Sequence, residues 1–364
     1  MPLRRSSIHC SNQFASSTSV VAIISKSDNN SVGLREIWQR LHESCAAQGW
    51  RGYDPYDGLN SPLARVLPGK RARQAWTQIH KRSVINFRPL CGIKPQLNST
   101  AVALFAMGSG DVRLLDLLDS LRTPSGGWGY PFGWQSRAFY APPNTPNLIC
   151  TALAIKAYRR FGRKPDTGFV DGLVTERSGE KWIRYIPQSE TQVHNINLMG
   201  AALLGRRDCV EFSVKRQRAD GSWWYGEAEN QRWIDNFHTG YNLVALREYE
   251  QTTGDASFAD AAQRGFVYWD KVFWLADGLP RYYHNRMYPI DIHCCAQGIL
   301  TYLAFGDVAK ADEVARWALK NMWDERGFFW YQHGRLAVNR IQYLRWSQSW
   351  MYFALSELIK AKSE

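Results

Sequence analysis

Polar side chains that can transfer protons or bind oxygen-rich ligands recur along this 364-residue chain. Each group stands just before an apolar stretch rich in small residues, and successive groups lie roughly 45 to 53 residues apart, a spacing typical of stacked supersecondary units. The groups are residues 98–100, 144–147, 194–197, 235–241 and 291–293, and a last set made of Gln342, Arg345 and Gln348. If the units form a ring, these groups meet at one central mouth, where we expect the functional site.

The group at 235–241 has the residues best suited to proton transfer. His238 and Tyr241 are three residues apart on the helix expected to begin there, so they share a face. A histidine can take or give a proton near neutral pH, and a tyrosine can protonate a leaving oxygen. Asn236 could hydrogen-bond a substrate carboxylate and so make the C5 proton of a uronic acid easier to remove. We predict these three as catalytic residues, and Arg88, Arg137 or Arg281 could be a basic partner. The alternative is that His238 only caps its helix and Tyr241 packs in the core.

A pair of carboxylates offers a second chemistry, because glycoside hydrolysis needs one acid and one base or nucleophile on either side of the bond. Asp235 and Asp291 are the catalytic candidates, each just before an expected inner helix. Further carboxylates on loops are Asp54, Asp57, Glu227 and Glu229. An aspartate in such a position also commonly caps its helix, so catalysis and capping both remain open.

Aromatic and polar residues near the expected mouth are candidates for substrate binding. A tryptophan ring can cover the C–H face of a pyranose, and a helix start needs only one capping residue, so additional polar residues there indicate ligand contacts. The predicted substrate-binding residues are Arg88, Trp128, Tyr130, Trp134, Gln135, Arg137, Asn144, His194, Asn195, Asn197, Trp224, Tyr283, His284 and His293. We expect His194, His238 and His293 to share one cavity with Trp128, and the opposite rim to be plain surface.

The elements that must position these residues follow the same period. After each apolar helix comes an amphipathic one, then a glycine turn with aromatic residues, as at 126–130, 220–225, 277–283 and 326–331. Unpaired helices at 34–45 and 346–359 would pair and close the ring. The sequence therefore predicts an all-α fold, an (α/α)6 toroid of helical hairpins with short aromatic strands at one rim, or seven hairpins if residues 73–84 form another.

The repeat favours one domain over residues 34–364, preceded by a Ser-rich segment, 1–33, that we expect to be a disordered extension. The net charge of +12 favours an anionic partner. No nucleic-acid-binding motif accompanies the basic residues, and no apolar stretch is long enough to cross a bilayer. Seven cysteines without a regular framework indicate reduced thiols and a cytoplasmic location.

The sequence disfavours two further chemistries. Zinc binding by His293, Cys294 and Cys295 is disfavoured because the adjacent cysteines point in different directions on a helix, so we predict no metal and no cofactor. Residues 217–223 resemble the Gln…Gly-x-Trp repeat of squalene cyclases, but the catalytic Asp-x-Asp-Asp is absent, so we predict no class II terpene cyclisation.

Four stretches, 52–59, 85–90, 128–137 and 235–240, carry a resemblance to known proteins. The chain resembles the α/α-toroid superfamily of six-hairpin glycosidases and toroidal polysaccharide lyases, and more closely the biosynthesis proteins of bacterial exopolysaccharide clusters. The resemblance implies a carbohydrate-active protein of exopolysaccharide metabolism that acts on an anionic polysaccharide or oligosaccharide by lyase or C5-epimerase proton abstraction. A glycoside hydrolase and a non-catalytic glycan-binding or assembly component remain the alternatives, because toroids host many chemistries.

Overall fold

The structure is a computed structural model that describes residues 26–364, with side chains from residue 33 onward. Most of the predicted N-terminal extension lies outside the described residues. The first helix, α1 (Lys26–Ala47), begins inside that segment, eight residues before the predicted boundary at 34.

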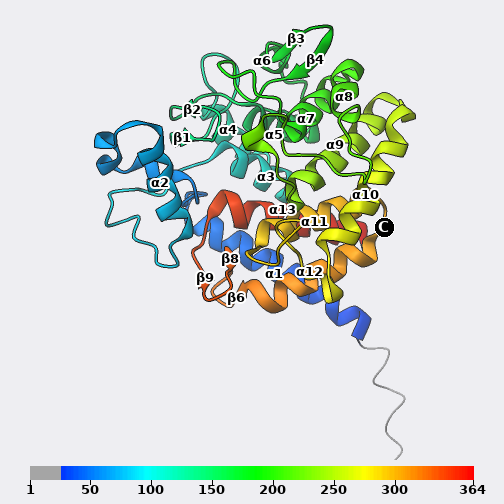
Figure 1. The fold of residues 1–364 in the computed structure, drawn as a ribbon. Coiled ribbons are helices and arrows are strands. Elements are labelled where there is room, and N and C mark those ends of the chain that lie inside the picture. The colour runs from blue at the N-terminus through cyan, green and yellow to red at the C-terminus, as the bar shows by residue number, and fades with distance from the viewer. Residues whose placement is uncertain (1–25) are drawn as a thin grey trace, which may run out of the picture.

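Six helices form an inner ring in the described part of the chain. They are α3 (Ser99–Ser109), α5 (Leu148–Arg160), α7 (His194–Leu204), α9 (Asn236–Thr253), α11 (Ile292–Ala304) and α13 (Trp350–Ala361). Each inner helix contacts the next, and α13 contacts α3, so the ring is closed. Figure 1 shows α3, in cyan, beside α13, in red, although the two lie far apart in the sequence. The all-α toroid predicted from the repeat is confirmed.

A second helix accompanies each inner one on the outside. These are α4 (Leu114–Ser120), the short α6 (Gly168–Asp171), α8 (Arg207–Val214), α10 (Ala259–Phe273) and α12 (Val308–Met322). The last hairpin is made by the two ends of the described chain, because α1 packs against α13. Six hairpins result, and the N- and C-terminal helices complete the ring as the unpaired helices of the sequence predict.

The helix α2 (Gly69–Arg82) does not make a seventh hairpin. It packs on the 3-10 turn Asp57–Asn60 and on strand β1 (Trp134–Gln135), and stands out from the toroid in Figure 1. The Trp76 indole donates to the carbonyl of Gly58 at 2.9 Å, and a buried ion pair joins Arg88 to Asp57 at 2.6 Å. The segment around α2 is thus an insertion fixed against one rim.

Short antiparallel strands lie between the hairpins. They are β1 (Trp134–Gln135) with β2 (Tyr140–Ala141), β3 (Val174–Arg177) with β4 (Glu180–Ile183), β6 (Trp323–Asp324) with β7 (Phe328–Phe329), and the sheet of β5 (Ile290–Asp291), β8 (Gln332–His333) and β9 (Val338–Asn339). In β1 and β2, Trp134 lies opposite Ala141. Short strands with aromatic residues are therefore present, and one of them, β7, coincides with the predicted glycine turn at 326–331.

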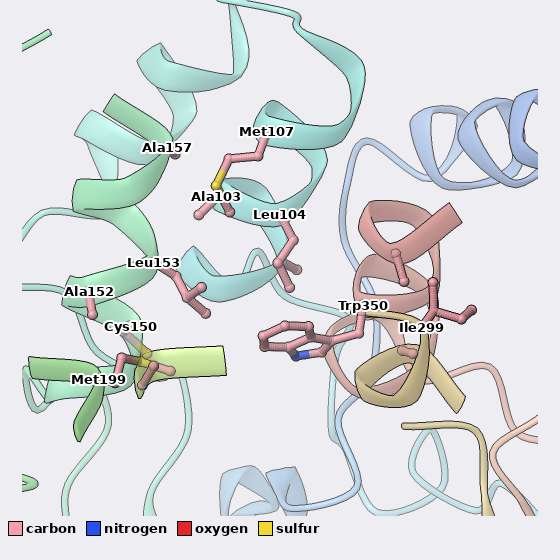
Figure 2. Packing of buried hydrophobic residues seen from close by; sticks show 14 of the residues in the cluster. Ala103, Leu104, Met107, Cys150, Ala152, Leu153, Ala157, Met199, Ile299 and Trp350 are labelled. Atoms are coloured by element: carbon pink, nitrogen blue, oxygen red, sulfur yellow. The ribbon is translucent and has the colours of Figure 1, made fainter. Parts of the chain in front are cut away.

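The core fills the ring and the space between its two helical layers. Inner helices are buried nearly all round, so they carry small and apolar residues such as Ala103, Ala152 and Leu153. In Figure 2, Leu104 of α3 and Leu153 of α5 point toward the ring of Trp350 from α13. Outer helices expose one face to solvent, so their sequences are amphipathic. This packing explains why the inner stretches are recognisable in the sequence.

Gly298 tests how tightly the layers pack. A Cβ atom at this position of α11 would lie 2.3 and 2.4 Å from ring carbons of the buried Trp274. We expect Gly298→Ala to lower the free energy of unfolding by about 1–3 kcal/mol or more, because the indole cannot move away without disturbing the core. Urea unfolding measures this.

Gly33→Ala in α1 is the control. A Cβ there meets no atom within 4 Å. It should leave stability unchanged or raise it by up to about 1 kcal/mol, because alanine favours a helix. Equal effects of the two substitutions would contradict the packing described here.

Candidate active site

A cavity of about 850 Å³ opens at the end of the ring where the inner helices begin. Every inner helix, or the segment leading into it, contributes a residue to its lining: Thr100, Ile149, Asn195, His238, His293 and Arg345. The polar groups of the repeat therefore converge on one end of the ring, and the larger cavity lies at that end.

Aromatic rings make up much of the cavity wall. They come from the loops between hairpins and from the helix starts: Tyr56, Tyr130, Phe132, Trp134, Phe139, Tyr185, Tyr225, Trp233, Phe237, Tyr282, Tyr283 and Trp346. Tyr225 stacks on Trp233 with ring centroids 4.4 Å apart, and the His238 ring lies 4.4 Å from Tyr225 and 4.2 Å from Phe237. A wall of this kind offers flat apolar faces to a ring-shaped substrate.

Asp235 and His238 form a hydrogen-bonded dyad at the start of α9. Asp235 is the N-cap, and its Oδ1 accepts from the backbone N–H of His238 at 3.0 Å. Its Oδ2 accepts from His238 Nδ1 at 2.7 Å and from the Trp233 indole at 2.8 Å. Because Nδ1 donates to the carboxylate, the neutral imidazole has its lone pair on Nε2. Nε2 has no protein partner among the described residues, so His238 is arranged to accept a proton from a ligand.

Tyr241 and His293 form a second pair on neighbouring inner helices. The Tyr241 hydroxyl lies 2.8 Å from His293 Nε2, and His293 Nδ1 lies 3.0 Å from the carbonyl of Trp346. Since a carbonyl only accepts, Nδ1 is the donor and Nε2 accepts from Tyr241. Burial lowers the pKa of His293 to about 3, so the ring is neutral at physiological pH. Burial also raises the pKa of Tyr241 well above its ordinary value, so the phenol keeps its proton.

The two pairs face one cavity. The His238 and Tyr241 rings have centroids 6.4 Å apart and both line it. One pair presents a proton acceptor and the other a proton donor. Environments that give two titratable groups opposite roles are typical of acid–base catalysis.

A π-helical segment, Leu344–Ser349, precedes α13 and brings Arg345 to the cavity. Arg345 Nε and Nη2 donate to the carboxylate of Asp54 at 2.5 and 2.9 Å, and both side chains are buried. Asp54 comes from the loop after α1, so this ion pair fastens the N-terminal loop to the last inner helix. π-helical turns occur often at functional sites. The sequence repeat includes Arg345, but its spacing gave no sign of the wider turn.

The charge of the cavity lining is positive. Lys81, Arg82, Arg137, Arg286 and Arg345 contribute to it, whereas Asp235 is the one carboxylate among its described lining residues. Lys81 Nζ lies 2.7 Å from the hydroxyl of Tyr56. Lys81 and Arg286 were not predicted, because α2 stands outside the repeat and nothing local in the sequence places it over the mouth.

Ten of the predicted site residues line the cavity. They are Tyr130, Trp134, Gln135, Arg137, Asn195, Asp235, His238, Tyr241, Tyr283 and His293. Of the four that we expected to share one cavity, His238 and His293 do so, and His194 and Trp128 do not.

Two predicted catalytic residues lie outside the lining. Asn236 is fully buried, donates to the carbonyl of Arg281 at 3.1 Å and accepts from the Trp269 indole at 3.0 Å. Asp291, also fully buried, accepts from the backbone of His293 at 2.9 Å and from the Trp346 indole at 3.0 Å. The expectation that they reach the mouth needs correction, because their hydrogen bonds join neighbouring parts of the ring.

Several predicted binding residues also lie outside the lining and make contacts within the protein. Trp128 donates to the carbonyl of Leu118 at 2.7 Å, and His194 bonds Ser213 and Glu227 at 3.0 and 2.8 Å. The others outside the lining are Arg88, Asn144, Asn197, Trp224 and His284. Arg88 pairs with Asp57, and Asn197 donates to the carbonyl of Cys209. Trp224 lies beneath Arg218, and His284 is hydrogen-bonded to the carbonyl of Ile234. Asn144 is an exposed turn residue.

A smaller cavity of about 300 Å³ lies toward the ends of the inner helices. Tyr241 and Trp350 line both cavities, with their ring centroids 5.3 Å apart, so they form the partition between them. The opposite rim is therefore hollowed, and not the plain surface that we expected. Among the described residues, no group of three or more His, Cys, Asp or Glu side chains is placed to hold a metal ion.

Asp291 gives a pH-dependent prediction. Burial raises its pKa to about 6, although hydrogen bonds from Gln332, His293 and Trp346 act in the opposite direction. Because the ordinary value is 3.8, the folded state holds this proton more tightly than the unfolded chain. The resulting stability is fully present below about pH 4 and is lost as the pH rises to about 6.

Asp291→Asn should remove this dependence. Relative to the original chain, the variant should gain on the order of 3 kcal/mol between about pH 4 and pH 7, measured by urea unfolding at both values. Any effect of the amide on stability that does not depend on pH cancels when the two pH values are compared. A difference that does not change with pH would contradict the assigned burial of the carboxylate.

Neither a family model nor a curated protein matches the sequence. Among solved structures, the chain is similar to an unsaturated glucuronyl hydrolase specific for heparin, with TM-score 0.54, 13% identity, and 93% of this chain and 98% of that one covered. It is also similar to ent-copalyl diphosphate synthase from Streptomyces platensis (TM-score 0.50, 17% identity, 94% and 70% covered). A third is cellobiose 2-epimerase from Bacillus thermoamylovorans (TM-score 0.52, 9% identity, 72% and 86% covered). At these identities the likeness establishes the fold, an α/α toroid of six hairpins.

Proposed function

We propose that this protein is an enzyme of bacterial exopolysaccharide metabolism that abstracts a proton from an anionic sugar, as a polysaccharide lyase or a C5-epimerase does. The observation that carries the proposal is the placement of a proton acceptor, His238, and a proton donor, Tyr241, in one positively charged, aromatic cavity. The six cysteines among the described residues carry free thiols, which supports a reducing, cytoplasmic setting.

In this mechanism His238 Nε2 takes the proton from C5 of a uronic acid. The imidazolium that forms stays bonded to Asp235 at 2.7 Å, so its charge is compensated as it develops. Lys81 and Arg286 at the mouth can pair with the sugar carboxylate, whose negative charge grows when C5 loses its proton.

The fate of the carbanion separates the two reactions. In elimination, the bond between C4 and its oxygen breaks, a C4–C5 double bond forms, and Tyr241 gives its proton to the departing oxygen. In epimerisation, Tyr241 returns a proton to C5 from the opposite face. In both, the tyrosine turns its hydroxyl from His293 toward the substrate and regains a proton from solvent, and His238 releases the C5 proton to solvent.

The cavity offers less support for glycoside hydrolysis. That reaction needs two carboxyl groups about 5–9.5 Å apart across the bond. Asp235 is the one carboxylate among the described lining residues, and it already accepts three N–H donors. Glu227 is bonded to His194, and Asp291 is buried outside the cavity.

The similar structures do not choose between chemistries. Two have the names of sugar-modifying enzymes and one that of a diphosphate synthase, so the fold alone leaves the reaction open. The aromatic wall and the basic mouth favour an anionic glycan, because rings can cover the sugar faces while cations pair with the carboxylates.

Incubation with polyuronides tests the proposal. Elimination would give an unsaturated product that absorbs in the ultraviolet, and epimerisation in deuterated water would introduce deuterium without that absorbance. His238→Ala should lower either rate about 10²–10⁴-fold. His42→Ala, a histidine of α1 outside the cavity, should leave the rate unchanged. Glycan binding without turnover, unaltered in His238→Ala, would favour a binding protein instead.

Asp235→Asn separates catalysis from folding. Asparagine can keep the cap, but its amide nitrogen cannot accept from the Trp233 indole, so the free energy of unfolding should fall by about 1–3 kcal/mol while the variant stays folded. The amide cannot compensate the charge of a protonated His238, so turnover should fall by about 10²-fold or more. Thermal unfolding and turnover, measured on the same preparation, check the expected stability and the expected loss of activity. A variant that is largely unfolded at the assay temperature would indicate a structural role for the dyad.

A further inference from the structure

The inserted segment between Gly58 and Asn98 has a charge that differs sharply from the rest of the chain. It contains eight Lys and Arg residues and no Asp or Glu. Of the basic residues, Arg88 is buried against Asp57. Arg65, Arg71, Arg82 and Lys94 are exposed and have no acidic partner within 4.0 Å among the described residues. The segment therefore presents uncompensated positive charge to solvent.

The same segment exposes apolar side chains. Of the eleven large apolar residues that are exposed in the described part of the chain, six lie here, which is more than half in about a tenth of its length. They are Leu63 at 58%, Val66 at 83%, Ile79 at 54%, Val84 at 46%, Ile85 at 72% and Leu90 at 89%. We call these six residues, with Arg65, Lys70, Arg71 and Lys94, the α2 surface.

The helix α2 has two faces with different roles. Thr77, Gln78 and Lys81 line the cavity. Arg71, Ala75 and Ile79, spaced four residues apart, are exposed. Arg82 also lines the cavity and lies three residues from Ile79, so the cavity mouth and the α2 surface adjoin along this helix.

The exposed face is fixed in place. The Trp76 indole is hydrogen-bonded to Gly58, and the Asn339 side chain donates to the carbonyl of Ser83 at 2.8 Å. Together with the buried pair of Arg88 and Asp57, these contacts hold the helix and the loops on both sides of it. The apolar residues are therefore presented by an ordered scaffold, as residues of an interaction surface are.

We propose that the α2 surface docks on an anionic phospholipid bilayer, with the cavity mouth beside the lipid headgroups. Interleaved cations and single large apolar side chains suit the headgroup boundary, where phosphates pair with Lys and Arg while apolar side chains enter the acyl region. A nucleic acid would match the charge but would leave six apolar side chains in water. The attachment is peripheral in this proposal; no helix in the described residues has the length and hydropathy to cross a bilayer.

Co-sedimentation with sucrose-loaded vesicles tests the docking, using the full chain. Vesicles of phosphatidylcholine with about one third phosphatidylglycerol should bind the protein about tenfold or more tightly than pure phosphatidylcholine, and salt should weaken the binding. Arg65→Glu with Arg71→Glu should lower binding to the anionic vesicles about tenfold or more. Neither residue lines the cavity, so turnover of a soluble substrate should not change.

The apolar part of the surface has its own test. Ile85→Asp with Leu90→Asp should reduce vesicle binding by about tenfold or more, because insertion is lost and repulsion is added. Val267→Asp is the matched control: Val267 is 56% exposed on α10, away from the segment. The docking is overturned if the original chain does not bind anionic vesicles, if neutral vesicles bind it equally, or if Val267→Asp loses as much binding. Binding to polyglutamate but not to vesicles would assign the surface to an acidic protein and would also overturn the proposal.

Discussion

The six inner helices begin inside the molecule, and their first backbone N–H groups must find partners without bulk water. This constraint shapes the whole toroid, because an unpaired buried N–H group costs about 1–3 kcal/mol. Buried side chains meet it in four helices: Asn98, Asn147, Asp235 and Asp291 are N-caps that accept from the following turn. The recurring polar groups in the sequence are thus first of all the caps of a ring.

The proposed chemistry depends on the carboxylate oxygen that a capping aspartate does not need for its own helix. Asp235 satisfies its helix with Oδ1 and has Oδ2 free to orient His238. Asp291 also caps with Oδ1, but its Oδ2 is used by Gln332 and Trp346, which ties α11 to the strands and to the last hairpin. Two aspartates with the same local sequence role therefore differ in chemistry because of what lies around them. The two cavity histidines differ in the same way: burial keeps His293 neutral, while His238 remains partly exposed beside a carboxylate.

The contrast between these aspartates and between these histidines shows what the sequence can predict and what it cannot. The period of the polar groups predicted the six hairpins, the ring closure by the two ends and the end of the ring where the larger cavity lies. It could not separate Asp235 from Asp291, or His238 from His194, because rotation of a helix about its axis decides which side chain enters the cavity. The residues around α2 carry no repeat, so their place over the mouth, and with it Lys81, is fixed only by distant contacts such as that between Arg88 and Asp57.

The wide turn at Leu344–Ser349 connects these elements. It lets one inner helix present Arg345 to both the cavity and Asp54, so the loop after α1 is bound to the last hairpin by a buried ion pair. Removing one partner of such a pair leaves an uncompensated charge and costs about 3–5 kcal/mol, so the two ends of the chain and the cavity wall depend on each other. The same loop continues into the turn that carries α2. The inserted segment, the mouth and the closure of the ring are thus joined through Asp54 and Asp57, which lie three residues apart and pair with Arg345 and Arg88.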